Sequence, residues 1–130
     1  MKAVILAGGS GTRLRPLTDT LPKPLVPVGG QPVLFSLLDS LRAAGATEAI
    51  ITLRYRGEQI RTRCGEHCRG VTLRYYEETE PLGTAGALPL FADFLGDEPF
   101  LVLSGDVCMQ TDLRKLLAFH REKDAEATLM

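Results

Sequence analysis

The sequence has few features that would indicate nucleic acid, a membrane or an oxidising compartment. Its 130 residues carry 15 Lys and Arg against 16 Asp and Glu, and this balance excludes the global positive field typical of nucleic-acid binding. No apolar run approaches the roughly 18 residues that a membrane span requires. Only three cysteines occur, and no basic-then-apolar signal segment precedes the first predicted strand. We therefore expect a cytoplasmic protein with no nucleic-acid or membrane partner.

The remaining composition is that of one globular domain, residues 1–130. With 45% hydrophobic residues, the chain can bury a core without disulfides. Apolar runs and helical periodicity alternate along the chain, which predicts a parallel sheet covered by helices. Strands are expected at 2–7, 49–53, 71–76 and 100–103, and helices at 31–44, 57–63, 84–95 and 111–123. Residues 127–130 look like the start of a further strand, so we expect the domain to be incomplete at its C-terminus.

An unusual cluster of residues follows the first predicted strand. Glycine occupies three of the four positions in Gly8–Gly11, which lets a ligand approach the backbone. Arg13 and Arg15 follow, and Asp19 is the only carboxylate before Lys23. Bare N–H groups beside fixed positive charge form a phosphate-binding arrangement, although the glycines alone also fit a plain tight turn. Arg15 fits a phosphate contact and a solvated surface equally well.

This glycine loop is neither of two common phosphate-binding loops. A dinucleotide fingerprint that begins at Gly9 would require glycine where Leu14 stands. It would also require an acidic residue after the second strand, which ends in Arg54-Tyr55-Arg56. A Walker loop would need Gly-Lys-Ser or Gly-Lys-Thr, and neither occurs. A Rossmann dehydrogenase is therefore disfavoured, and no Ser–His–Asp or Cys–His arrangement indicates nucleophilic catalysis.

Three ordered stretches resemble the motifs of sugar-1-phosphate nucleotidyltransferases. Residues 6–28, LAGGSGTRLRPLTDTLPKPLVPV, resemble the glycine-loop signature of that family. Residues 78–87, ETEPLGTAGA, resemble its base-reading loop, especially in the mannose-1-phosphate guanylyltransferase branch. Residues 104–107, SGDV, resemble its metal-aspartate motif. The resemblance implies a three-layer α/β/α, Rossmann-like fold with a mainly parallel sheet, of the nucleotide-diphospho-sugar transferase type.

The resemblance implies a nucleotidyl transfer. An oxygen of a sugar 1-phosphate attacks the α-phosphorus of a nucleoside triphosphate, pyrophosphate leaves, and an NDP-sugar forms. Such a transfer requires alignment and charge neutralisation more than covalent chemistry. Arg13 is then implied to hold the leaving pyrophosphate, Lys23 to act near the α-phosphate, and Asp106 to hold Mg²⁺. The implied nucleotide-binding residues are Leu6, Ala7, Gly8, Gly9, Gly11, Thr12, Arg13, Glu78 and Gly83.

Glu78 bears on the identity of the base. An ionised carboxylate only accepts hydrogen bonds, and guanine presents two adjacent donors where uracil and thymine present one. We therefore expect GTP and mannose 1-phosphate as substrates and GDP-mannose as a product, in a chain that is compatible with a homo-oligomer. Two alternatives stay open: a glucose-1-phosphate thymidylyl- or uridylyltransferase, and a non-catalytic regulatory relative that binds nucleotide sugars.

Two further groups of possible ligands are not expected to bind metal. Cys64, His67 and Cys68 could begin a zinc site, but a structural zinc requires about four ligands and no fourth is evident. Asp112 is expected to cap a helix rather than to hold a second metal ion. Gln110 stands where the family commonly has a further acid.

Overall fold

The computed structural model describes all residues, 1–130, and its centre is a five-stranded sheet in the order β5-β6-β4-β1-β7. Four of its strands are parallel, namely β1 (Lys2–Leu6), β4 (Glu48–Leu53), β6 (Val71–Glu77) and β7 (Leu101–Ser104). The short β5 (His67–Cys68) pairs antiparallel with β6 at one edge. The prediction of a mainly parallel sheet is therefore confirmed.

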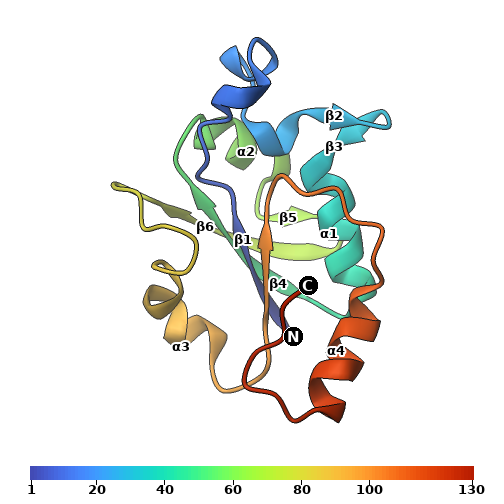
Figure 1. Cartoon of the computed structure of the whole chain (residues 1–130). Helices are drawn as coiled ribbons and strands as arrows, with labels where there is room; N and C mark the ends of the chain where they lie inside the picture. Colours follow the sequence, from blue (N-terminus) through green and yellow to red (C-terminus); the bar gives the residue numbers. More distant parts are fainter.

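Helices cover both faces of this sheet, so the three-layer prediction is also confirmed. One face carries α1 (Val33–Ala43), α2 (Gly57–Cys64) and α4 (Leu113–Glu122). The other face carries only the 3₁₀ helix η4 (Leu88–Phe91) and the short α3 (Ala92–Leu95). Figure 1 shows α3 to the left of the sheet, and α1 and α4 to its right.

The side chains of each strand divide between two hydrophobic clusters, as the two-residue period of a strand requires. In β1, Ala3 and Ile5 belong to the larger cluster with α1, α2 and α4. Val4 points the other way and belongs to a smaller cluster with Ile50, Ala87, Phe91 and Leu95. Because β1 is buried on both faces, its apolar run is continuous rather than alternating.

The segment between β1 and α1 is more ordered than the predicted loop at 8–24. It contains three 3₁₀ turns, η1 (Thr12–Leu14), η2 (Leu17–Asp19) and η3 (Lys23–Leu25). A two-stranded hairpin of β2 (Pro27–Val28) and β3 (Gln31–Pro32) follows. Helix α1 thus begins at Val33, after Pro32, and not at residue 31 as predicted.

Two further predictions were wrong. Residues 84–87 form turns rather than the start of a helix, and Thr84 does not cap one. The backbone turns so tightly there that a Cβ at Gly86 would lie 2.0 Å from the Leu82 carbonyl oxygen. Pro89, which lacks an N–H, then lies in the first turn of η4, where that group is not needed. Residues 127–130 pair with no strand.

The other helix boundaries follow local signals in the sequence. Helix α1 ends before Gly45, whose φ is +90°, a conformation that favours glycine. Asp112 caps α4 as predicted, because its carboxylate accepts the Arg114 backbone N–H at 3.0 Å. None of these helices combines the length and the apolar character that crossing a membrane would demand.

We expect the core under α1 to dominate the stability of the fold. Leu38 is fully buried, so Leu38→Ala should lower the free energy of unfolding by about 2–5 kcal/mol. Leu90, which is 57% exposed, provides the matched control, and Leu90→Ala should change stability by less than about 0.5 kcal/mol. Denaturant unfolding measures both, and equal losses in the two variants would contradict this assignment of the core.

Candidate active site

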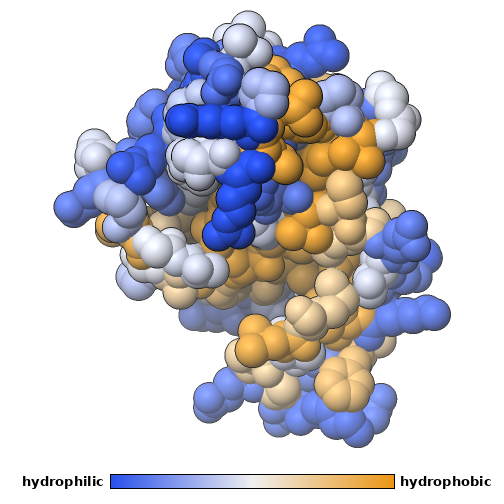
Figure 2. All heavy atoms as spheres, turned by 45° about the horizontal axis from the view of Figure 1, so that its top comes forward, coloured by the Kyte–Doolittle hydropathy of each residue, from blue (hydrophilic) through white to orange (hydrophobic).

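Three of the sequence motifs meet at the carboxyl edge of the sheet. The glycine loop follows β1, Glu78 follows β6, and Asp106 follows β7 two residues after Ser104. Parallel strands bring these ends together, and ligands of open α/β sheets bind at that edge. In Figure 1 the turns after β1 lie at the top of the view. Figure 2 brings this end forward and shows strongly hydrophilic side chains beside an apolar strip.

Backbone hydrogen bonds continue past the strand ends and fix the motifs in register. The Gly105 N–H donates to the Leu6 carbonyl at 2.8 Å, and the Ala7 N–H donates to Thr52 O at 3.2 Å. A Cβ at Gly105 would lie 3.1 Å from the Ala7 Cβ, so the chain after β7 packs closely on the chain after β1. Leu6 and Ala7, both predicted to bind nucleotide, therefore serve as the rigid base of the loop.

Glu78 lies directly against the glycine loop. Its N–H donates to the Leu53 carbonyl at 2.8 Å, which holds the residue beside the end of β4. A Cβ on Gly8 would lie only 2.8 Å from the Glu78 Oε2 atom, so glycine leaves room for this carboxylate. Gly83 is exposed, and no atom comes within 4 Å of the position of its Cβ. The structure therefore places Glu78 against the loop, whereas Gly83 lies exposed with open space at its Cβ position.

Lys23 and Asp106 form an ion pair across the site. The Lys23 Nζ donates to Asp106 Oδ2, and the Ser104 hydroxyl donates to Asp106 Oδ1 at 2.5 Å. Partial burial acts to raise the pKa of Asp106, but the hydrogen bonds from Lys23 and Ser104 outweigh it, and the pKa lies below its usual value. The carboxylate is therefore ionised at neutral pH.

The two arginines of the loop have different surroundings. Arg15 forms an exposed ion pair with Asp19 at 3.4 Å, within the loop itself. Arg13, in η1 beside the exposed Thr12, is exposed and has no carboxylate partner. Arg13 is thus the guanidinium that is free to bind an anion.

Only some of the glycines in the loop are required by the fold. Gly11 has φ +68°, and a Cβ there would lie 2.9 Å from Thr18 Cγ2. Gly9 is exposed, has no such φ, and has no atom within 4 Å of a Cβ position. The fold therefore requires glycine at position 11. At position 9, neither the backbone conformation nor the packing requires glycine.

The residues at Asp106 fit a magnesium ion. No group of three or more His, Cys, Asp or Glu side chains comes together anywhere in the chain. Magnesium does not need such a group, because it is usually bound through one or two carboxylates with substrate phosphates and water. The ionised carboxylate of Asp106, at the carboxyl edge of the sheet, can supply the protein's part of such a site.

The surroundings of Cys64 and Cys68 raise the pKa of both thiols. Cys64 and Cys68 lie close to one another, and burial, followed by the nearby Cys68, raises the pKa of Cys64 to about 12. Burial also raises the pKa of Cys68. Together with His67, the two cysteines do not form a group of three possible metal ligands.

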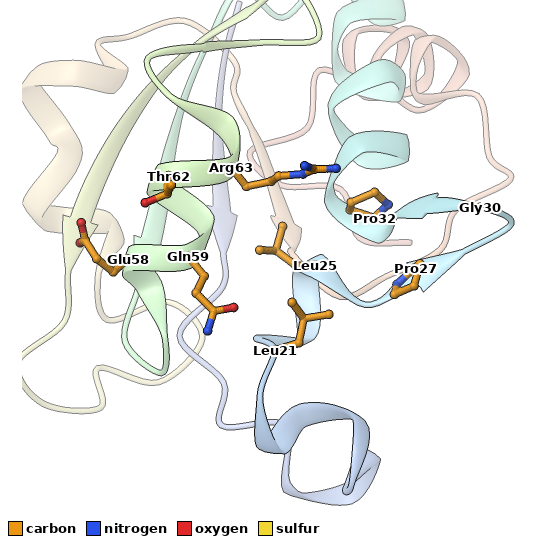
Figure 3. Close-up of a pocket in the computed structure, with 9 residues that line it drawn as sticks. All are labelled: Leu21, Leu25, Pro27, Gly30, Pro32, Glu58, Gln59, Thr62 and Arg63. Atoms are coloured by element: carbon orange, nitrogen blue, oxygen red, sulfur yellow. The ribbon is translucent and has the colours of Figure 1, made fainter.

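A pocket of about 810 Å³ lies beside the site rather than in it. Its walls come from the segment before α1 and from α2, and Figure 3 shows Leu21 and Leu25 facing Gln59 across it. Neither the glycine loop, Glu78 nor Asp106 lines this pocket. The pocket and the site share one segment of the chain, because Leu21 and Leu25 line the pocket and Lys23 lies between them in the sequence.

The sequence did not reveal the side chains that hold the loop in place. Tyr55, Arg56 and Gln59, at the start of α2, donate hydrogen bonds to main-chain carbonyls of the loop. The sequence Arg54-Tyr55-Arg56 shows only that no acidic residue follows the second predicted strand. The available signal was that the polar residues Tyr55, Arg56 and Gln59 follow the carboxyl end of a strand, where they can bind a neighbouring loop.

The fold and the site define an α/β protein with a glycine-rich, arginine-bearing loop at the carboxyl edge of a mainly parallel sheet. The family model for nucleotidyl transferases matches residues 2–130. The chain belongs to this nucleotidyl transferase family.

Individual relatives agree with this assignment. The chain is 46% identical to the mannose-1-phosphate guanyltransferase of Yarrowia lipolytica and 43% identical to that of Schizosaccharomyces pombe. Both alignments include 100% of this chain but only 37% of the relative, so the chain spans little more than a third of their length.

Solved structures share the fold. HddC from Yersinia pseudotuberculosis, complexed with GMP-PN, is 32% identical with a TM-score of 0.77, over 92% of this chain and 53% of that one. UDP-glucose pyrophosphorylase from Acinetobacter baumanii has a TM-score of 0.83 over 95% of this chain and 53% of that one. Its 21% identity supports the fold alone.

We expect the two glycines of the loop to differ in what they contribute to stability. Gly11→Ala should cost about 1–3 kcal/mol, because the new Cβ meets Thr18 and the backbone has a positive φ. Gly9→Ala should leave stability unchanged or raise it by up to about 1 kcal/mol, by restricting the unfolded chain. Thermal and denaturant unfolding measure both variants, and an equal loss at Gly9 would show that the fold needs that glycine too.

Proposed function

We propose that residues 1–130 form the nucleotide-binding portion of a sugar-1-phosphate nucleotidyltransferase that joins GTP and mannose 1-phosphate into GDP-mannose and pyrophosphate. The meeting of the glycine loop, Glu78 and the Lys23–Asp106 pair at one edge of the sheet carries this proposal. The names of relatives at 43–46% identity support the pair of substrates. The chain spans 37% of the length of those relatives. Nucleotide binding is therefore the part of the function that experiments on this chain can test directly.

The glycine loop would bind the triphosphate. The N–H groups of Gly8, Gly9 and Gly11 are donors for phosphate oxygens, and the unpaired Arg13 adds a guanidinium that can bind two oxygens at once. Gly9 supports this role, because nothing in the fold requires glycine there. A bare backbone at Gly9 is explained by the close approach of a ligand.

The order of the strands suggests how the nucleotide lies. Glu78 stands after β6, the glycine loop after β1 and Asp106 after β7, and β1 lies between the other two in the sheet. We therefore infer that the base lies near Glu78, that the phosphates cross the glycine loop, and that the α-phosphate lies toward Lys23 and Asp106.

The Lys23–Asp106 pair would take part in the transfer itself. Asp106 would hold Mg²⁺, which when bound would neutralise charge on the phosphate oxygens. Lys23, drawn from Asp106 to the α-phosphate, would stabilise negative charge as the sugar-phosphate oxygen bonds to phosphorus and the bond to pyrophosphate breaks. Because Arg13, Lys23 and Asp106 are all present, we favour an enzyme over a non-catalytic regulatory relative.

A guanine nucleotide is favoured by Glu78. Its carboxylate can accept the two adjacent donors of guanine, and uracil or thymine would offer it one. HddC, which was solved with GMP-PN, supports the same preference. We also propose a cytoplasmic location, in keeping with three free cysteines.

Arg13→Ala should weaken GTP binding by about 10- to 100-fold, because it removes hydrogen bonds between a charged donor and phosphate. The affinity for GMP should be unchanged, since GMP lacks the β- and γ-phosphates. Arg15→Ala is the matched control, because Arg15 already pairs with Asp19, and it should bind GTP like the wild type. Titration calorimetry measures these affinities, and an unchanged GTP affinity in Arg13→Ala would refute the role of Arg13.

Thermal-shift titration with Mg²⁺ tests the choice of nucleotide, since a ligand that binds only the folded state raises its melting temperature. GTP should stabilise the wild-type chain more than UTP or dTTP, and Glu78→Gln should lower that preference by about 10-fold or more. Glu80→Gln, an exposed neighbour in the same loop, should keep it. The absence of stabilisation by all three nucleotides would contradict the proposed function. A preference for UTP or dTTP would instead favour the thymidylyl- or uridylyltransferase alternative.

A further inference from the structure

A set of hydrogen bonds outside the predicted site holds the segment that carries Arg13. Three consecutive main-chain carbonyls of the loop, those of Thr18, Asp19 and Thr20, accept hydrogen bonds from side chains at the start of α2. The donors are Tyr55 Oη at 2.8 Å, Arg56 Nη2 at 2.5 Å and Gln59 Nε2 at 3.0 Å, in the same order. We refer to Tyr55, Arg56 and Gln59 as the carbonyl clamp.

Thr18 connects the carbonyl clamp to the glycine loop. Its carbonyl accepts from Tyr55, and its own hydroxyl donates to the Gly11 carbonyl at 2.6 Å. Thr18 is only 1% exposed, so it lies inside the loop rather than on its surface. Gly11 is the N-cap residue immediately before η1, the turn that carries Arg13. A continuous path of contacts therefore runs from Tyr55 through Thr18 and Gly11 to the turn that carries Arg13.

The backbone of the carbonyl clamp is itself held in an uncommon conformation. Arg56 has φ +53°, in the left-handed region that arginine rarely adopts. Its guanidinium donates to Tyr55 Oη at 3.0 Å as well as to the Asp19 carbonyl, and it lies over the Tyr55 ring. Strain of this kind persists where the surroundings determine the conformation, and it is common at functional sites. Figure 3 shows Gln59 pointing from α2 toward Leu21, at the end of the same loop.

We propose that Tyr55, Arg56 and Gln59 are positioning residues that hold Arg13 where it meets the β- and γ-phosphates. This inference rests on the proposed function, in which Arg13 binds the triphosphate. None of the three side chains needs to touch the nucleotide. They act on main-chain carbonyls, so they fix the path of the loop without using the Arg13 side chain, which is left free for the ligand.

Tyr55→Phe removes one donor and keeps the ring, so it tests the carbonyl clamp with little change in packing. Tyr75→Phe is the matched control, because the Tyr75 hydroxyl donates to the Gly65 carbonyl, away from the loop. In the chain without nucleotide, Tyr55→Phe should speed amide hydrogen exchange at residues 11–20 and leave the strands unchanged, whereas Tyr75→Phe should not affect that segment. Unchanged exchange at residues 11–20 in Tyr55→Phe would overturn the inference.

Nucleotide affinity then separates positioning from a merely structural role. Tyr55→Phe should weaken binding of GTP with Mg²⁺ by about 3- to 10-fold, the effect of one hydrogen bond, and leave GMP binding unchanged. In an Arg13→Ala background the same change should have no further effect, because residues that act as a unit are not additive. A loss that is equal for GTP and GMP, or one that persists without Arg13, would overturn the inference.

The two proposals fail in different ways. A wild-type chain that binds no nucleotide would overturn the proposed function, and the exchange of residues 11–20 would still decide whether the carbonyl clamp holds the loop. A wild-type chain that binds GTP, beside a Tyr55→Phe variant that binds it equally well, would overturn the positioning role alone.

Discussion

The parallel pairing of β1 with β4 on one side and β7 on the other is the constraint on which the rest of the structure depends. It brings the ends of the strands to one edge, and backbone hydrogen bonds extend that register into the loops. The Gly105 N–H binds Leu6 O, and the Glu78 N–H binds Leu53 O. The main chain of the sheet thereby sets the positions of Glu78 and of the segment around Gly105, whereas the position of Arg13 depends on the path of the loop.

The cations of the site are held in different ways, and the difference matches the chemistry proposed for them. The ammonium of Lys23 is paired with Asp106, so it is held in place before any phosphate arrives. Arg13 is unpaired, and its position depends on the path of the loop. A strong anion can therefore occupy Arg13 at once but must compete for Lys23. Such a division would favour a ligand with several phosphates over one with a single phosphate.

Much of the fold and of the site could be predicted from the sequence because the signals are local. The continuous apolar run of β1 reflects burial on both faces. The glycine loop is recognisable from its closely spaced glycines and the arginines that follow them. Only the first turn of the helix predicted at 84–95 was wrong, because the chain turns tightly between Leu82 and Gly86 before η4 begins at Leu88. The carbonyl clamp could not be predicted either, because main-chain carbonyls accept from any suitable donor and leave no preferred residue type at Thr18 or Asp19. The pairing of Lys23 with Asp106 joins residues far apart in the chain and needed the sheet order to be known.

The place of β1 in the sheet also bears on how the chain folds. Ala3 pairs with Ala49 on one side and with Leu101 on the other, so the pairing of β1 joins residues far apart in the chain. Contacts between residues so distant in sequence require large loops to close before they stabilise anything, which slows folding. During synthesis, the edge of β1 that pairs with β7 keeps its N–H and C=O groups unpaired until β7 has emerged. An unpaired strand edge can form hydrogen bonds with other chains. The same topology that assembles the site therefore leaves β1 open to pairing with other chains until β7 is in place.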